Sequence, residues 1–184
     1  MDLAAVSSPG GMAVAPIHAV RPESACSRLF PRKRNHRLMD HVIEINDVDQ
    51  LRPLRGVWNR LLLETGQASF FQSLPWLEAY WRRYGRGQRL RVLVVGDREP
   101  VGILPLTVIR ERTRAGWIRT LTYPLHDWGT RFGPIGPDPA ATLAAGLKHL
   151  QRTRQDWDML DLRWISAGAQ LLSATVHAMR SAGF

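Results

Sequence analysis

The spacing of apolar residues switches between strand and helix patterns along the chain, and the order of these switches restricts the fold more than any other feature. The order is strand, helix, helix, three strands, helix, strand and helix. The segments are 41–45, 47–66, 73–85, 90–95, 101–109, 117–123, 139–150, 159–165 and 167–182. Short turns join the consecutive strands, which predicts an antiparallel group, and the helix that follows predicts a crossover. The sequence therefore predicts an α/β fold of the α+β kind, with a mixed sheet.

Local signals mark where several of these elements begin or are interrupted. Asp47 with Gln50 three residues later resembles a capping box, and Ser73 and Asp138 stand where helix N-caps are expected. Pro105 lies inside the strand pattern and has no N–H to donate to a neighbouring strand. It therefore predicts a sheet edge or a bulge at that point.

Residues 1–38 show no sustained apolar period, and Gly and Pro interrupt their apolar part. They hold six basic and two acidic residues, so +4 of the net charge of +9 lies here. This composition is typical of a disordered, basic leader and does not fit a signal peptide. We place the domain at 39–184 and hypothesise that Met39 is the natural start, the leader being either a tail or a gene-calling artefact.

Composition excludes several classes of protein. The chain of 184 residues is 45% apolar and 22% charged, as in soluble globular proteins, and no apolar run approaches the ~18 residues of a membrane span. Its single cysteine, Cys26, permits no intrachain disulfide, which favours a reducing compartment, the cytoplasm. The arginines of 39–184 are scattered among apolar residues, which argues against nucleic acid as a partner. Inward-facing positions predict a core location for four tryptophans: Trp58, Trp81, Trp117 and Trp164.

Most catalytic schemes find no support in the sequence. The six histidines lack zinc-ligand spacing, so no metal site is predicted, and neither a Gly-x-Ser-x-Gly elbow nor a Walker loop occurs. The string 82–87 (RRYGRG) matches an Arg-x-x-Gly-x-Gly phosphate loop in letters, but it follows a helix and precedes a strand. Because the N-terminus of a helix is what binds the anion, we interpret this string as a helix end and a turn.

Several short segments of 41–184 resemble a known family. They are Phe70–Leu77 (FFQSLPWL), Trp81–Gly85, Val101–Leu106, the loop Tyr123–Gly133 and Asp161–Trp164. With the order of elements, they are similar to the GNAT N-acetyltransferase superfamily, and within it to the CelD-like acetyltransferases associated with bacterial cellulose biosynthesis. The resemblance implies a GNAT-like fold and transfer of an acyl group from acetyl-CoA, or another acyl-CoA, to an amine or hydroxyl acceptor. The acceptor is then a small molecule or a saccharide, with a link to polysaccharide biosynthesis.

The chain also departs from this family. CelD-like proteins usually carry two GNAT-like halves, and this chain resembles the first half, without the final strand pair that closes a GNAT sheet. We therefore expect a fold that is incomplete at its C-terminus, completed by a second GNAT-like half or by a homodimer. The alternative to an enzyme is a non-catalytic GNAT-like half that binds a partner or a saccharide, or a truncated gene product.

In GNAT proteins the cofactor pyrophosphate binds a loop between a strand and a helix, which corresponds here to 129–138. Three prolines in and next to this loop lack N–H donors, and Asp138 places a carboxylate where the phosphate would lie. The sequence therefore argues against a standard CoA site in this half, and no cofactor-binding residue is assigned. Arg131 remains a candidate for contact with a phosphate from the rim.

The same loop carries the candidates for the acceptor side. Asp127 is predicted to bind or deprotonate the acceptor, His126 to act as a base, and Trp128 to stack on a sugar or acyl group. Alternatively Asp127 caps the loop backbone and Trp128 fills the core. Ser73 and Trp76, in the aromatic segment before the second helix, are predicted to bind substrate, with packing of that helix onto the sheet as the alternative.

Overall fold

The computed structural model describes residues 41–114, 116–124, 129, 131–163 and 169–184. The predicted leader 1–38, with Cys26, and the proposed start at Met39 lie outside the described residues. The elements are β1 (Val42–Ile45), η3 (Val48–Leu54), α1 (Arg55–Glu64), η4 (Phe70–Gln72), α2 (Leu74–Tyr84), β2 (Arg89–Val95), β3 (Gly102–Thr113), β4 (Gly116–Thr122), α3 (Pro139–Arg152), β5 (Met159–Asp161) and α4 (Ala169–Ser181). The mixed α/β class and the predicted order of elements are confirmed.

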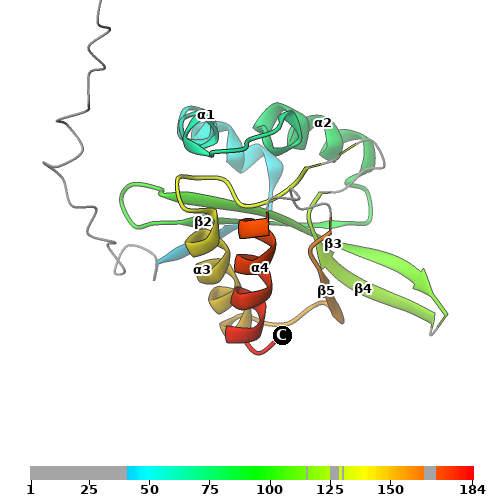
Figure 1. The fold of residues 1–184 in the computed structure, drawn as a ribbon. Coiled ribbons are helices and arrows are strands. Elements are labelled where there is room, and N and C mark those ends of the chain that lie inside the picture. Colours follow the sequence, from blue (N-terminus) through cyan, green and yellow to red (C-terminus); the bar gives the residue numbers. More distant parts are fainter. Residues whose placement is uncertain (1–40, 115, 125–128, 130, 164–168) are drawn as a thin grey trace, which may run out of the picture. The chain divides into compact units, whose positions relative to one another are not determined.

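The strands form one five-stranded sheet in the order β1-β2-β3-β4-β5 (Figure 1). Neighbours from β1 to β4 are antiparallel, whereas β4 and β5 are parallel. A parallel pair needs a long connection, and α3 provides it. The carboxyl ends of β4 and β5 consequently lie at the same end of the sheet.

Helices cover both faces of this sheet, with α1 and α2 on one side and α3 and α4 on the other (Figure 1). Alternation along β2 divides the core between the two sides. Leu90 and Val92 pack with Trp58 of α1, while Leu93 packs with Leu147 of α3. These side chains are fully buried, and each contributes on the order of 1.5–3 kcal/mol through burial.

The helix predicted over 47–66 is divided in two. Asp47 is the N-cap, and its Oδ1 accepts a hydrogen bond from the N–H of Asp49 at 2.9 Å. The predicted capping box with Gln50 is not what forms, because the Gln50 N–H donates to the backbone carbonyl of Asp47. The first part, however, is the 3-10 helix η3, which contains Pro53, and regular α-helix begins only at Arg55. Proline lacks the N–H that an α-helical turn requires, which accounts for the change of helix type at this point.

Pro105 lies in β3, the middle strand, and not in an edge strand of the sheet. Its position is nevertheless a local edge. The backbone of Ile103 pairs with Ile135 on the side away from β2, and pairing with β4 begins only at Thr107. Because backbone N–H groups alternate in direction along a strand, the missing N–H of Pro105 faces the interval between these pairings. Within the described residues, no ladder bond is therefore lost.

The tryptophan predictions have mixed outcomes. Trp58 is fully buried, and Trp81 is partly buried against the same cluster, as predicted. The prediction for Trp117 is wrong, because its side chain is 64% exposed. Trp117 pairs with Arg112 in a part of the β3–β4 hairpin that extends beyond the pairing of β2 and β5. Trp164 lies outside the described residues.

Asp138 begins α3, and its Oδ1 accepts a hydrogen bond from the N–H of Ala141 at 3.0 Å. We expect Asp138→Ala to lower the free energy of unfolding by about 1 kcal/mol, because an N-cap acceptor is lost. Asp97→Ala, in the exposed turn after β2, serves as the control and is expected to change it by less than about 0.5 kcal/mol. Chemical denaturation measures both, and equal effects would contradict the capping role.

Candidate functional site

A shallow pocket opens between the N-terminal end of α2 and the chain that follows β4. Its lining residues are Trp58, Phe71, Gln72, Ser73, Trp76, Leu77, Pro105, Pro124, Phe132 and Gly133. The enclosed space is only about 10 Å³, roughly the room for one water molecule, and it reaches about 250 Å³ only when open solvent is counted. The lining is almost wholly apolar and includes no titratable side chain, so the described part of the site favours an apolar or aromatic group over a charged one.

The sheet itself creates room for this pocket. Pairing between β3 and β4 stops at Thr107 and Thr122, after which the chain leaves the sheet through Tyr123 and Pro124. Pro105, which lies in β3 just before this pairing begins, also lines the pocket. The pocket therefore lies where β3 and β4 part, near the carboxyl end of the parallel pair β4 and β5. Ligands of α/β sheets commonly bind outside the carboxyl ends of parallel strands.

Gln72 fixes the wall of the pocket that is formed by the returning loop. It is 6% exposed, and its Nε2 donates to the carbonyl oxygens of Gly133 at 3.3 Å and Pro134 at 3.4 Å. Its Oε1 accepts from the N–H of Ser69 at 2.9 Å, and its backbone carbonyl accepts from Trp58 Nε1 at 2.9 Å. A buried amide with its donors and acceptors engaged holds α1, η4 and the loop in one arrangement.

Five aromatic rings form a continuous cluster from the core to the mouth of the pocket. Tyr123 stacks on Phe132 with centroids 6.3 Å apart, and Phe132 contacts Phe71 at 6.0 Å. Phe71 meets Trp76 edge to face at 5.1 Å, and Phe70 meets Trp76 at 5.8 Å. Phe70 is 65% exposed, so the outer end of the cluster offers aromatic surface to an incoming ligand.

Two buried donors of this cluster, Trp76 Nε1 and Tyr123 Oη, have no hydrogen-bond partner among the described residues. Burial raises the pKa of the Tyr123 phenol, so the group stays protonated and remains a donor at neutral pH. Leaving a buried donor unpaired costs about 1–3 kcal/mol. A ligand that places a carbonyl or hydroxyl oxygen against Trp76 Nε1 would recover this free energy, and Trp76 lines the pocket.

The structure brings two of the predicted site residues together. Ser73 and Trp76 both line the pocket, and the Ser73 hydroxyl caps α2 by accepting from the N–H of Trp76 at 3.3 Å. Arg131 is exposed and is not part of the lining, and its backbone carbonyl accepts from Ser69 Oγ at 2.8 Å. The predicted acceptor residues His126, Asp127 and Trp128 lie outside the described residues, between Pro124 and Gly133 of the lining.

Both interpretations of possible phosphate loops agree with the geometry. The string 82–87 covers the end of α2, where Gly85 is the C-cap and Gly87 has a φ of 81° in the turn before β2. At the N-terminus of α3, the carboxylate of Asp138 accepts the N–H that an anion would otherwise bind. This helix end therefore does not fit the pyrophosphate of CoA.

Most of the pocket wall lies in segments that the sequence analysis singled out, but of the lining residues it assigned only Ser73 and Trp76 to a site. Phe71 and Gln72 belong to the aromatic segment that was singled out, but Pro124 and Phe132 reach the pocket only because the loop folds back onto η4. Because Pro124 and Phe132 are far from α2 in the sequence, no periodic pattern could indicate that they contact the same pocket. Pro105 did carry a signal, since a proline inside a strand marks a break in pairing.

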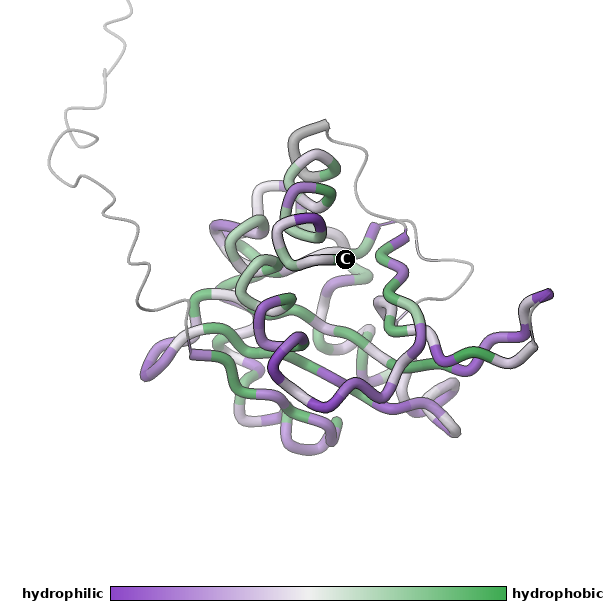
Figure 2. The backbone as a smooth tube through the Cα atoms, turned by 90° about the horizontal axis from the view of Figure 1, so that it is seen from below, coloured by the Kyte–Doolittle hydropathy of each residue, from purple (hydrophilic) through white to green (hydrophobic). Residues whose placement is uncertain are grey.

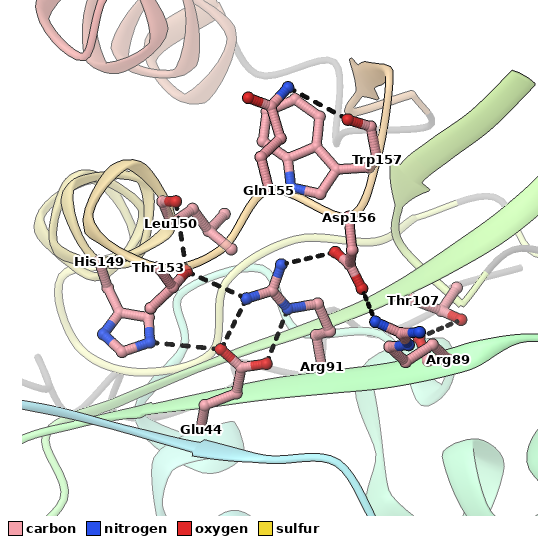
Figure 3. Close-up of polar contacts among 10 residues, drawn as sticks. All are labelled: Glu44, Arg89, Arg91, Thr107, His149, Leu150, Thr153, Gln155, Asp156 and Trp157. Atoms are coloured by element: carbon pink, nitrogen blue, oxygen red, sulfur yellow. Dashed lines mark hydrogen bonds and ion pairs between the residues drawn. The ribbon is translucent and has the colours of Figure 1, made fainter.

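A cluster of charged side chains lies on the opposite face of the sheet from the pocket, beneath α3 (Figure 3). Arg91 of β2 is 4% exposed, and its Nε and Nη2 donate to the carboxylate of Glu44 at 2.7 and 2.8 Å. Its Nη1 donates to Asp156 at 3.2 Å, and Arg89 pairs with the other oxygen of Asp156. His149 Nε2 lies 3.3 Å from Glu44 Oε2. We call these five residues the Arg91 cluster.

The Arg91 cluster is electrostatically balanced. Burial raises the pKa of Glu44, but the hydrogen bonds and charge of Arg91, followed by those of His149, outweigh burial and hold that pKa below its ordinary value. Two carboxylates face two guanidinium groups. The cluster joins β1, β2 and the end of α3 in one ionic network, which is a structural role.

In the described part of the chain, no group of three or more His, Cys, Asp or Glu side chains is placed to hold a metal ion. None of the described helices combines the length and the apolar character that crossing a membrane requires. No protein-family model, curated protein or solved structure matches the chain. Functional inference therefore rests on the pocket and its surroundings.

Proposed function

We propose that residues 41–184 form a GNAT-type acyltransferase domain, related to the CelD-like acetyltransferases. It moves an acyl group from acetyl-CoA or another acyl-CoA to an amine or hydroxyl of a small-molecule or saccharide acceptor. The acyl end of the thioester occupies the apolar pocket beside Trp76, and the acceptor approaches from the loop that contains Asp127.

One observation carries this proposal. The antiparallel strands β1 to β4 are followed by a crossover through α3 to the parallel strand β5, and a pocket opens where β3 and β4 part. This is the order of elements that the resemblance to GNAT proteins implies. The pocket and the Trp76 indole lie near the carboxyl end of β4, and the predicted acceptor residues follow β4 in the sequence.

The reaction needs few groups from the protein. The acceptor nitrogen or oxygen attacks the thioester carbonyl carbon, the C–S bond breaks, and the departing thiolate gains a proton as the acceptor loses one. Asp127 or His126 takes the proton from the acceptor. The buried N–H of Trp76 donates to the carbonyl oxygen as negative charge develops there.

The residues present fit only part of acyl-CoA. The apolar lining suits an acyl group, which needs the lining side chains to move apart on binding, whereas Asp138 occupies the helix end where a pyrophosphate would bind. We therefore assign the acyl-thioester end of the substrate to this domain and do not assign the nucleotide end. The same observation favours a second candidate function, a non-catalytic GNAT-like module whose pocket binds an apolar or saccharide group.

Calorimetric titration of the full chain separates these functions. Acetyl-CoA is compared with S-acetylpantetheine, which has the same thioester end but no pyrophosphate. We expect both to bind, with dissociation constants within about threefold of each other, because no helix N-terminus is available to bind the pyrophosphate of acetyl-CoA.

Trp76→Ala is expected to weaken the binding of both thioesters about tenfold, through loss of ring contacts and of the indole donor. Trp117→Ala, which removes an exposed indole outside the pocket, is the matched control and leaves unchanged the binding of S-acetylpantetheine, which carries neither a base nor a pyrophosphate.

Each other outcome contradicts a specific part of the proposal. Binding of acetyl-CoA more than about 100-fold tighter than S-acetylpantetheine would contradict the assignment at Asp138. Absence of binding by either thioester, with the fold verified by circular dichroism, would contradict the acyltransferase function and favour the binding module.

A further inference from the structure

The outer part of the β3–β4 hairpin is a two-stranded ribbon that leaves the rest of the sheet. Pairing of β2 with β3 ends at Val108, and pairing of β5 with β4 begins at Thr120. Residues 109–113 and 116–118 therefore pair only with each other, whereas the backbone carbonyl of Arg119 accepts a hydrogen bond from the Asp158 N–H at 2.8 Å. Figures 1 and 2 show this ribbon projecting from the domain, with hydrophilic residues at its end. We call residues 109–114 and 116–119 the ribbon.

Arginines scattered in the sequence gather on one face of the ribbon. Arg110 and Arg112 share the face of Leu106 and Val108, which is the side covered by α3 and α4 further along the strand. Arg119 lies directly opposite Arg110 in the register. In the described part of the chain, no acidic side chain forms an ion pair with Arg110 or Arg112, and both are exposed.

An exposed aromatic ring lies among these arginines. Trp117 is directly opposite Arg112, so the two side chains share a face, and the Arg110 guanidinium lies 5.7 Å from the centroid of the Trp117 ring. The ring is 64% exposed, so part of its surface remains open to a ligand. Charges on a free strand pair can protect it from aggregation, but an exposed tryptophan beside them works against such protection.

The arrangement also carries an electrostatic cost. Like charges directly opposite each other destabilise a strand pair, and here Arg110 faces Arg119 with Arg112 on the same face. Asp158 pairs with Arg119 at 2.6 Å and offsets one of these charges. The charges of Arg110 and Arg112 have no such acidic partner among the described residues.

We propose that the ribbon is a docking site for single-stranded nucleic acid, in which Arg110 and Arg112 bind phosphates and Trp117 stacks on an unpaired base. Guanidinium groups match phosphate geometry through two parallel hydrogen bonds. An open indole face stacks on any unpaired base, whereas a duplex keeps its bases stacked on each other. The site is separate from the pocket and does not depend on the acyltransferase proposal.

The test is fluorescence anisotropy of a labelled dT oligonucleotide, titrated with the full chain at several salt concentrations. We expect Arg110→Gln with Arg112→Gln to weaken binding at least tenfold and to reduce the slope of log K against log salt by about one to two. Trp117→Ala is expected to weaken binding about tenfold with little change in that slope. The basic residues 1–38 are present in every variant, so their contribution cancels in the comparison.

Arg82→Gln with Arg83→Gln is the matched control. It removes the same charge from the exposed end of α2, on the opposite side of the sheet, and is expected to weaken binding less than about threefold. Equal losses in the two double variants would overturn the proposal in favour of general charge attraction. Unchanged binding by Trp117→Ala, or equal affinity for duplex DNA, would overturn the stacking role. Trp117-dependent sedimentation with phosphatidylglycerol vesicles, without oligonucleotide binding, would assign the ribbon to a lipid surface instead.

Discussion

Replacing Arg91 by methionine is expected to lower the free energy of unfolding by about 3–5 kcal/mol. The Arg91 side chain is 5% exposed, and it is the partner that neutralises Glu44 and part of Asp156, which are 17% and 13% exposed. Methionine fills most of the volume but leaves these carboxylates without that charge. Uncompensated buried charge destabilises far more than loss of one exposed ion pair. Urea denaturation measures the difference.

A matched control variant and a second substitution test whether the loss of stability in Arg91→Met comes from buried charge. Arg55→Met removes an arginine from the more exposed pair with Glu78 and is expected to cost at most about 1 kcal/mol. Adding Glu44→Gln to Arg91→Met is expected to recover part of the loss, since one uncompensated charge disappears. Equal losses for Arg91→Met and Arg55→Met would show that the Arg91 cluster is not a buried ionic network.

The same cluster predicts how stability depends on pH. The pKa of Glu44 in the folded chain lies below 4.5, the ordinary value that it regains on unfolding. Below pH 4.5 the unfolded chain therefore binds a proton that the folded chain does not, and the stabilisation from Glu44 is lost progressively. Without Arg91, burial still raises the pKa of Glu44 and only His149 remains to lower it. The difference in unfolding free energy between wild type and Arg91→Met should thus shrink as the pH falls, and a constant difference would contradict the account.

Replacing Trp58 by alanine is expected to lower the free energy of unfolding by about 3–5 kcal/mol. Trp58 is fully buried between α1 and the sheet, and its Nε1 donates to the carbonyl of Gln72 at 2.9 Å. Alanine leaves a cavity and an unpaired carbonyl at the residue that positions the pocket wall. Trp58→Phe, which loses chiefly the donor, is expected to cost about 1–2 kcal/mol.

Trp117→Ala is the control for this prediction as well, because it removes an equally large ring that is 64% exposed. It is expected to cost less than about 1 kcal/mol. Thermal and urea unfolding monitored by far-UV circular dichroism give all three values. A small loss for Trp58→Ala, comparable with that for Trp117→Ala, would contradict the packing of α1 onto the sheet.

Local sequence signals predicted the fold well where a residue acts on its own neighbours. Ser73 and Asp138 cap α2 and α3 through side-chain oxygens, as their positions indicated. Pro105 was predicted to mark an edge or a bulge, and it lies in the middle strand where pairing on one side is interrupted. The prediction identified that Pro105 cannot donate a hydrogen bond to a neighbouring strand. Only the long-range pairing of Ile103 with Ile135 shows that the interruption is on the side of β3 away from β2.

The apolar periodicity failed to predict burial where a strand extends beyond the helices that pack on the sheet. Trp117 has the spacing of an inward-facing residue, but alternation only assigns a side chain to a face and cannot tell whether a helix covers that face. The pocket was similarly hidden, because Gln72 and Gly133 are joined by a hydrogen bond between residues 61 positions apart in the chain. Of the predicted site residues, Ser73 and Trp76 line the pocket, while the roles of Asp127, His126 and Trp128 stay predictions.

The indole N–H resonances of ¹⁵N-labelled protein test the central claim most directly. Trp76 Nε1 and Trp157 Nε1 are both buried without a partner in the described part of the chain, but only Trp76 lines the pocket. The account predicts that adding acetyl-CoA shifts one buried indole resonance, the one absent from Trp76→Ala, and leaves the Trp157 resonance in place. Unchanged indole resonances at saturating thioester, or a shift of Trp157 without one of Trp76, would contradict an acyl-binding pocket at this site.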